Sequence, residues 1–229
     1  MTFFTKETVR FWKGLAKNNN KAWFDENRKD YEKYLKEPYY RLAEALVEQV
    51  REVEPEYDTP PKQAVYRINR DTRFAKDKTP YKTRLGITVG RSKKHDESWP
   101  AYTVSMGVDG IWIAGGLYMP PTELRDHMRR YIGEHSSDLK KLERKSTKFA
   151  KTFGTLQGEA QKRPLADLKD IANTEPRVLN TQWVFWQDFN DKALFTEPKL
   201  DQFILDQWEI ARPVMELMKD GVRAYVPSE

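Results

Sequence analysis

Apolar residues in the N-terminal quarter of the chain recur at intervals of three and four positions, which is the period of an amphipathic helix. This spacing predicts three helices, over residues 5–17, 21–36 and 38–53. The asparagines at 18–20 tolerate a left-handed backbone, so we expect them to stop the first helix. Pro38 is expected to end the second helix and to start the third, because proline suits the first helical turn.

After a proline-rich loop at 55–61, the apolar residues alternate with polar or small ones, and this period of two predicts strands. The alternating runs lie at 66–68, 85–89, 102–108 and 111–114. Asp109-Gly110 separates the last two runs and favours a two-residue hairpin turn, whose two central positions need a positive φ. Gly115 and Gly116 come next, and two glycines allow either a ligand or a neighbouring strand to approach the backbone closely.

Helical spacing returns in the second half of the chain, where helices are predicted from Thr122, from Ser137 and over about 198–219, with a strand-like aromatic run at 183–186. Helices, then consecutive strands, then helices is the order of an α+β fold. We predict an antiparallel β-sheet with flanking helices and helical N- and C-terminal regions in a single domain, 1–229. Its expected parts are a helical segment at 5–53, a sheet at 64–118 and a mixed helical and loop segment at 122–221.

The composition indicates a folded, soluble protein with a heavily charged surface. Charged residues make up 33% of the chain against roughly 25% in typical globular domains, while 7 Trp, 11 Tyr and 11 Phe argue against disorder. The absence of cysteine excludes disulfides, thiolate metal sites and thiol catalysis. No apolar run is long enough to span a membrane, and residues 1–10 lack the apolar core of a signal peptide. We therefore expect a cytoplasmic protein with no membrane partner.

Positive charge is concentrated in one segment of the chain. Residues 62–94 contain eleven basic and two acidic side chains, a net charge of +9, whereas the whole chain of 229 residues carries +5. The remainder of the chain therefore carries −4. Such an asymmetry indicates an anionic ligand or an anionic surface as a partner.

Within this segment, residues 66–83 are predicted to leave a strand as a loop, and loops held by rigid sheets often carry function. Arginine offers a planar fork for phosphate or carboxylate, and lysine adds a mobile point charge. Phe74 and Tyr81 supply rings that anchor the loop or stack on a base. The predicted ligand-binding residues are Arg67, Arg70, Asp71, Arg73, Lys76, Asp77, Lys78, Tyr81 and Lys82.

Several motifs spread over most of the chain belong together. They are Phe-Trp-Lys-Gly-Leu at 11–15, Asn-Asn-Asn-Lys-Ala-Trp-Phe at 18–24, Tyr-Arg-Ile at 66–68, Arg-Asp-Thr-Arg-Phe at 70–74, Asp-Lys-Thr-Pro-Tyr-Lys-Thr at 77–83, Gly-Gly-Leu-Tyr at 115–118 and Lys-Arg-Pro at 162–164. In these motifs the chain resembles the family called domain of unknown function 2461. Beyond Pro164 the sequence departs from the family's usual pattern. The resemblance implies no activity, cofactor or catalytic residue.

Three functional hypotheses follow from residues 66–83. The first is binding of a small ligand that bears phosphate or carboxylate. The second is binding of nucleic acid, because basic side chains alternate with aromatic rings. The third is a structural or protein-interaction loop that braces itself through Asp71 and Asp77.

An enzyme built on the same loop would hold the anion with its arginines and use an aspartate as a general base or metal ligand. The side chains concerned are Arg70, Arg73 and Lys78 for the anion, Asp71 or Asp77 for the base, and Tyr81 as a donor. No serine-hydrolase elbow and no glycine-rich nucleotide loop occurs in the sequence.

The three histidines do not predict a metal site. His127 and His135 are eight residues apart and do not share a tight helical face, and His95 lies in a charged loop. We expect neither a metal nor a cofactor.

Overall fold

The computed structural model describes residues 2–92, 96–191 and 194–226. Lys93 and Lys94 of the basic segment, and His95, lie outside the described residues. The chain divides into two compact units: unit 1 is Met1–Lys94, Thr103–Ile113 and Asp188–Leu205, and unit 2 is His95–Tyr102, Ala114–Gln187 and Asp206–Glu229. The prediction of a single domain stays a prediction.

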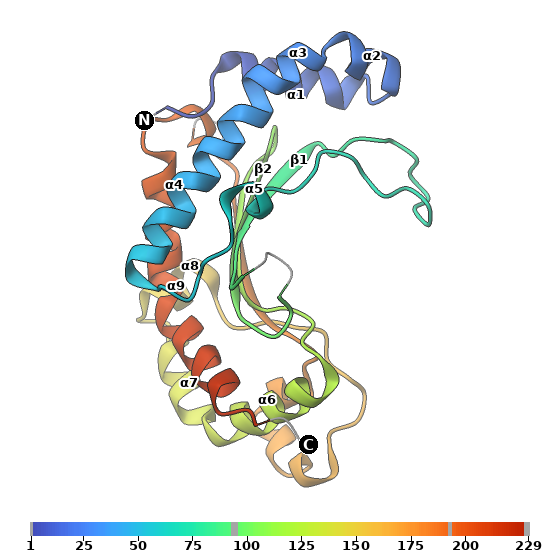
Figure 1. Ribbon diagram of the computed structural model, residues 1–229. Coiled ribbons are helices and arrows are strands. Elements are labelled where there is room, and N and C mark those ends of the chain that lie inside the picture. The colour runs from blue at the N-terminus through green and yellow to red at the C-terminus, as the bar shows by residue number, and fades with distance from the viewer. Residues whose placement is uncertain (1, 93–95, 192–193, 227–229) are drawn as a thin grey trace. The chain divides into compact units, whose positions relative to one another are not determined.

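A four-stranded antiparallel sheet with helices before and after it along the chain confirms the predicted α+β fold (Figure 1). Its strands lie in chain order: β1 (Arg84–Val89), β2 (Ala101–Gly107), β3 (Gly110–Leu117) and β4 (Trp183–Phe189). Alternate residues of β2, among them Tyr102, Val104 and Met106, are buried, which is the pattern that predicted the strand.

The hairpin between β2 and β3 is confirmed, but its turn lies one residue earlier than predicted. Val108 and Asp109 form the turn, and Gly110 is already the first residue of β3. Gly110 has φ +133, whereas Asp109 does not have a positive φ. A Cβ on Gly110 would lie 2.4 Å from the carbonyl oxygen of Phe189. The glycine is therefore required by the close approach of β4 as well as by its own backbone angle.

The N-terminal segment of unit 1 is helical, as predicted. Its elements are α1 (Lys6–Lys17), α2 (Lys21–Glu26), α3 (Arg28–Tyr31), the π-helical turn η1 (Glu32–Lys36) and α4 (Glu37–Val53), followed by the short α5 (Pro61–Ala64). The predicted second helix is divided at Asn27. Pro38 lies in the first turn of α4, as predicted, but it does not separate two helices, because η1 runs directly into α4.

The asparagines at 18–20 act differently from the prediction. Asn18 ends α1 with φ −128, so the expected left-handed stop is wrong. Asn20 instead caps the next helix, because its side-chain oxygen accepts a hydrogen bond of 3.0 Å from the backbone N–H of Trp23. The middle residue, Asn19, forms a contact with a distant part of the chain that is described below.

Unit 1 is held together by α4 and the first two strands. Tyr39 of α4 is fully buried, and its hydroxyl lies 3.1 Å from the carbonyl oxygens of both Leu85 in β1 and Met106 in β2. Burial raises the pKa of Tyr39 well above its ordinary value, so the hydroxyl keeps its proton and donates it. The Tyr39 ring contacts Phe4 and Trp12, and Phe4 stacks on Phe195 of the turn η5 (Leu194–Thr196).

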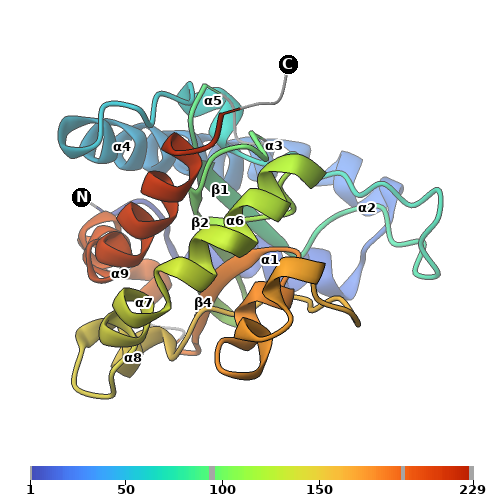
Figure 2. The same cartoon turned by 90° about the horizontal axis from the view of Figure 1, so that it is seen from below.

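Unit 2 contains the helices α6 (Thr122–Glu134), α7 (Ser136–Leu142) and α8 (Lys148–Phe153) and the 3-10 turns η2 (Ala166–Leu168), η3 (Ile171–Asn173) and η4 (Pro176–Leu179). Thr122 begins α6 without capping it, and the helix predicted from Ser137 is broken into α7 and α8. The turn η4 lies beside α6 (Figure 2), where Arg129 donates a hydrogen bond of 3.0 Å to the carbonyl oxygen of Asn180.

The last helix, α9 (Leu200–Arg223), carries Pro213 in its interior. None of the helices in the described ranges is both long enough and apolar enough to cross a membrane.

Gly115 and Gly116 allow β3 and β4 to lie close together. Gly116 has φ +124, and a Cβ there would lie 2.2 Å from the carbonyl oxygen of Trp183. A Cβ on Gly115 would lie 2.6 Å from the ring of Phe185. The contact of two strands therefore accounts for this pair of glycines without a ligand.

We expect Gly116→Ala to destabilise the protein by roughly 2–5 kcal/mol, because a positive φ costs an alanine about 1–2 kcal/mol and overpacking adds about 1–3 kcal/mol. Gly154→Ala is the matched control, since Gly154 also has a positive φ, +78, but has nothing within 4 Å of its Cβ position. Gly154→Ala should therefore lower the free energy of unfolding only by the cost of the positive φ, about 1–2 kcal/mol. Chemical denaturation measures both, and equal losses for the two variants would contradict the role given to β4.

Candidate functional site

The basic arm, residues 66–83, extends from unit 1 beyond the start of β1 (Figures 1 and 2). Two isolated antiparallel bridges, Val65 to Ile87 and Asn69 to Tyr81, pair its two ends. Between these bridges the outgoing chain advances four residues and the returning chain six, so the pairing shifts by two. The continuous strand predicted at 66–68 is therefore wrong, because the shifted register prevents a regular ladder.

Tyr81 anchors the base of the arm. The side-chain amide of Asn19 donates to the carbonyl oxygen of Tyr81 at 2.9 Å and accepts from its backbone N–H at 3.1 Å. The Tyr81 ring stacks on Phe24 of α2 with ring centroids 4.1 Å apart, and the residue is only 6% exposed. Of the two roles proposed for this ring, anchoring is the one that the contacts support.

The Arg70 side chain joins the two sides of the arm. Its guanidinium forms an ion pair with Asp77 and a hydrogen bond with the hydroxyl of Thr79. Asp77 also accepts a hydrogen bond of 2.9 Å from the backbone N–H of Thr79. These bonds favour the ionised carboxylate and lower the pKa of Asp77 to about 2, with the Thr79 N–H making the largest contribution.

The tip of the arm has a second set of internal contacts. Asp71 accepts hydrogen bonds from Nε and Nη2 of Arg73, the latter at 2.6 Å. Because these bonds stabilise the ionised carboxylate, they lower the pKa of Asp71. Lys78 reaches back across the arm and donates to the carbonyl oxygens of Thr72 at 2.9 Å and Arg73 at 3.4 Å. Both aspartates and three of the six basic residues of the arm are therefore engaged in fixing its shape.

Three predicted site residues, Arg67, Lys76 and Lys82, have no ion pair with any residue that the structure describes. Lys82 lies over the ring of Tyr66, 5.3 Å from its centroid. Burial first, and the charge of Arg67 second, lower the pKa of Lys82. The backbone N–H of Lys82 donates a hydrogen bond of 2.8 Å to the carbonyl oxygen of Ile68, so Lys82 lies opposite the residue that follows Arg67 at the base of the arm.

Phe74 projects from the tip and is 95% exposed. The guanidinium carbon of Arg73 lies 6.0 Å from the centroid of the Phe74 ring, and the Arg73 side chain is itself 78% exposed. An exposed ring beside an exposed cation is a surface that other molecules can use.

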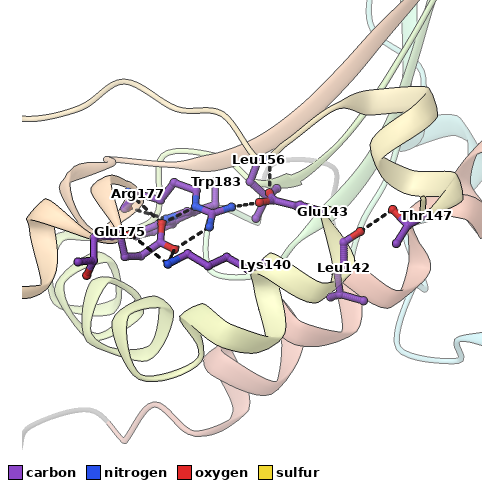
Figure 3. A network of polar contacts seen from close by, with 9 residues as sticks. Lys140, Leu142, Glu143, Thr147, Leu156, Glu175, Arg177 and Trp183 are labelled. Atoms are coloured by element: carbon purple, nitrogen blue, oxygen red, sulfur yellow. Dashed lines mark hydrogen bonds and ion pairs between the residues drawn. The ribbon is translucent and has the colours of Figure 1, made fainter. Parts of the chain in front are cut away.

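A second polar cluster, which the sequence did not reveal, lies inside unit 2 (Figure 3). Arg177 of η4 contacts both oxygens of Glu175, at 2.5 and 2.6 Å, and forms an ion pair with Glu143 at the end of α7. Glu175 is 1% exposed. Glu143 also accepts from the backbone N–H of Leu156 at 2.6 Å, and Lys140 lies 4.0 Å from Glu175. The two carboxylates are satisfied within the protein, so the cluster stabilises unit 2.

The histidines that the structure describes take part in ordinary packing. His127 contacts the carbonyl oxygen of Gly221 at 2.9 Å, and His135 stacks on Tyr131. In the part of the chain that is described, no three His, Asp or Glu side chains gather as a metal site requires.

The comparison with known families agrees with the motifs of the arm and the N-terminal helices. Residues 7–217 match a family described as conserved hypothetical protein (DUF2461). The chain belongs to the DUF2461 family. The match continues well beyond Pro164, so the departure from the family pattern there does not mark the end of the family's domain. Searches of curated proteins and of solved structures gave no match.

Removing Arg177 should destabilise the DUF2461 protein strongly, because the buried carboxylates of Glu175 and Glu143 lose the guanidinium that pairs with both of them. We expect Arg177→Met to cost roughly 3–5 kcal/mol in the free energy of unfolding. Arg130→Met is the control, since Arg130 pairs with Asp167 on the surface and such pairs contribute about 0–1 kcal/mol. Urea denaturation measures the free energy of unfolding of both variants. Similar decreases for the two would show that the buried cluster stabilises the protein no more than a surface ion pair does.

The carboxyl group of Asp77 should titrate at about 2, below its ordinary value of 3.8. Because the pKa is lowered in the folded arm, the ionised carboxylate stabilises the arm above about pH 4, and this contribution is lost as the pH falls through about 2. An NMR titration of the Asp77 side chain measures the pKa. Thr79→Val removes the hydrogen bond of 2.9 Å that the Thr79 hydroxyl donates to the Asp77 carboxylate, so it should raise this pKa. An ordinary pKa in the wild type would contradict the bracing by Arg70 and Thr79.

Proposed function

We propose that the protein binds a phosphate- or carboxylate-bearing ligand on the basic arm and that Arg67 and Lys82 make the principal contacts. The single observation that carries this proposal is the pair of neighbouring cations without an ion-pair partner among the described residues. Three further residues that the sequence predicts as ligand-binding, Arg70, Arg73 and Lys78, also form bonds within the arm that hold its shape.

The energetics of Lys82 support an anion at this position. Burial removes part of the hydration of Lys82, and the positive charge of Arg67 adds repulsion, so both effects lower the pKa of Lys82. The negative charge of a bound anion would offset both costs and raise the pKa again. Arg67 supplies a planar fork that suits either phosphate or carboxylate.

The arm supports binding better than it supports acid–base catalysis. Asp71 and Asp77, the candidate general bases, both have lowered pKa values because they already accept several hydrogen bonds. A carboxylate with a pKa far below neutrality is a weak base for a reaction at neutral pH. The ring of Tyr81, the candidate donor, is buried and stacks on Phe24, which suits an anchor.

A self-braced structural arm is the competing proposal, and the ion pairs of Arg70 and Arg73 favour it. It differs in one measurable respect. In a purely structural arm, Arg67 and Lys82 have no shared role. The structural proposal therefore predicts that the protein does not bind anions at this position.

Isothermal titration with inorganic tripolyphosphate and with citrate tests the proposal. We expect Arg67→Gln with Lys82→Gln to weaken binding at least roughly tenfold, because each charge-assisted hydrogen bond contributes about 1.5–3 kcal/mol. Affinity of the wild type should fall as the pH rises through the lowered pKa of Lys82, since the lysine then loses its charge.

Arg41→Gln with Arg51→Gln is the matched control, because both arginines are exposed on α4 and the change in net charge is the same. This variant should bind both anions nearly as the wild type does. If the wild type binds neither anion, or if the two double variants lose affinity equally, the arm does not hold a specific anion and the structural proposal takes its place.

A further inference from the structure

The tip of the arm is built to present an aromatic ring to another molecule. Phe74 is 95% exposed, whereas Phe4, Phe11 and Phe24 of the same unit are at most 4% exposed. The residues around Phe74 are held by Asp71, which accepts from both the backbone N–H and the guanidinium of Arg73, and by Lys78. The ring therefore projects from a braced loop, and a ligand that stacks on it has little backbone to immobilise.

Positive charge adjoins the exposed ring. Arg73 donates to Asp71 through Nε and Nη2, which leaves Nη1 without a hydrogen-bond partner among the described residues. Its guanidinium lies 6.0 Å from the centre of the Phe74 ring. Lys76 is also exposed at the tip and has no ion pair within the described part of the chain. A ring for stacking and cations for phosphate thus lie side by side.

The two groups of cations lie at different positions along the arm, one beside the bridge between Asn69 and Tyr81 and the other beyond the pairing of Arg70 with Pro80. Arg67 and Lys82 are at the base, whereas Arg73 is six residues farther along the outgoing chain, a distance of up to roughly 20 Å for extended backbone. A small ligand with one phosphate needs only one of the two groups. A polymer with a phosphate at regular intervals can contact both groups, and one of its bases can stack on the Phe74 ring beside Arg73 at the tip.

We propose that the anionic ligand is single-stranded nucleic acid, with one base stacked on Phe74 and phosphates bound by Arg73 at the tip and by Arg67 and Lys82 at the base. This inference rests on the proposed function of the arm and names its ligand class. Stacking on an exposed aromatic ring together with backbone contacts to basic side chains is the general mode of single-strand recognition. A duplex hides the faces of its bases, so the ring favours the single strand.

Fluorescence anisotropy with labelled single-stranded DNA and RNA of about 20 nucleotides tests the inference, since known single-strand modules cover about 4–16 nucleotides. The probes for comparison are the same DNA as a duplex, and inorganic polyphosphate as competitor. We expect the single strands to bind more tightly than the duplex. Phe74→Ala should weaken single-strand binding roughly 5- to 100-fold, and Phe74→Trp should restore it, because stacking depends on the ring.

Two further measurements separate stacking from charge. Phe74→Ala should leave polyphosphate binding unchanged and should leave the salt dependence of DNA binding unchanged, because it removes no phosphate contact. Arg73→Gln should reduce the slope of log affinity against log salt by about 0.7, the value for one phosphate of a single strand. Val53→Ala, at another exposed apolar residue of unit 1 that is 59% exposed, is the matched control and should change neither.

The outcomes distinguish the two proposals. Polyphosphate binding without a preference for single strands, and without an effect of Phe74→Ala, overturns the nucleic-acid inference and leaves anion binding in place. If neither polyphosphate nor any oligonucleotide binds, both proposals fail. If Phe74→Ala instead abolishes binding to vesicles of anionic phospholipid while oligonucleotides do not bind, the arm contacts membranes and the inference is overturned.

Discussion

The placement of the arm depends on one side-chain amide. Asn19 pairs with both backbone groups of Tyr81 in the way that a neighbouring strand would, at the isolated bridge between Tyr81 and Asn69 where the register of the arm shifts. The ring of Tyr81 also stacks on Phe24 of α2. The two hydrogen bonds and the stacked rings together fix the base of the arm to the helical segment. This anchor also positions the outer part of the arm, including the ion pair of Arg70 with Asp77.

The protein uses ion pairs in two different ways, and burial decides which. On the arm, Asp77 and Asp71 are exposed, so their pairs with arginine contribute little to global stability and act mainly by restricting the shape of a loop. In unit 2, Glu175 is 1% exposed, and the bidentate contact with Arg177 compensates for the hydration that the carboxylate has lost. The same chemical pair therefore directs local conformation at the surface and maintains the fold in the interior.

Local patterns in the sequence predicted much of the fold. The helical period predicted α1 and α4, and Asp109-Gly110 predicted the β2–β3 hairpin, because each of these signals depends on neighbouring residues. The position of the turn was wrong by one residue because it depends on a distant part of the chain. Gly110 belongs to β3, where Phe189 of β4 lies against it. Charge counting located the arm, but which cations pair internally depends on how the loop folds back. Glu143 and Arg177 are 34 residues apart with no shared motif, so only the fold could bring them together.

The strand order has a consequence for how the chain acquires its structure. Strands β1, β2 and β3 follow one another along the chain and pair in that order, whereas β4 joins β3 only after 65 intervening residues. Closing so long a loop costs conformational entropy that the first three strands avoid. Until β4 has been synthesised, β3 is therefore an edge strand, and the backbone N–H and C=O groups on its outer side have no strand to pair with. The glycines that admit β4 also carry no side chain that could block this edge, so the nascent chain is most open to wrong pairing at this stage.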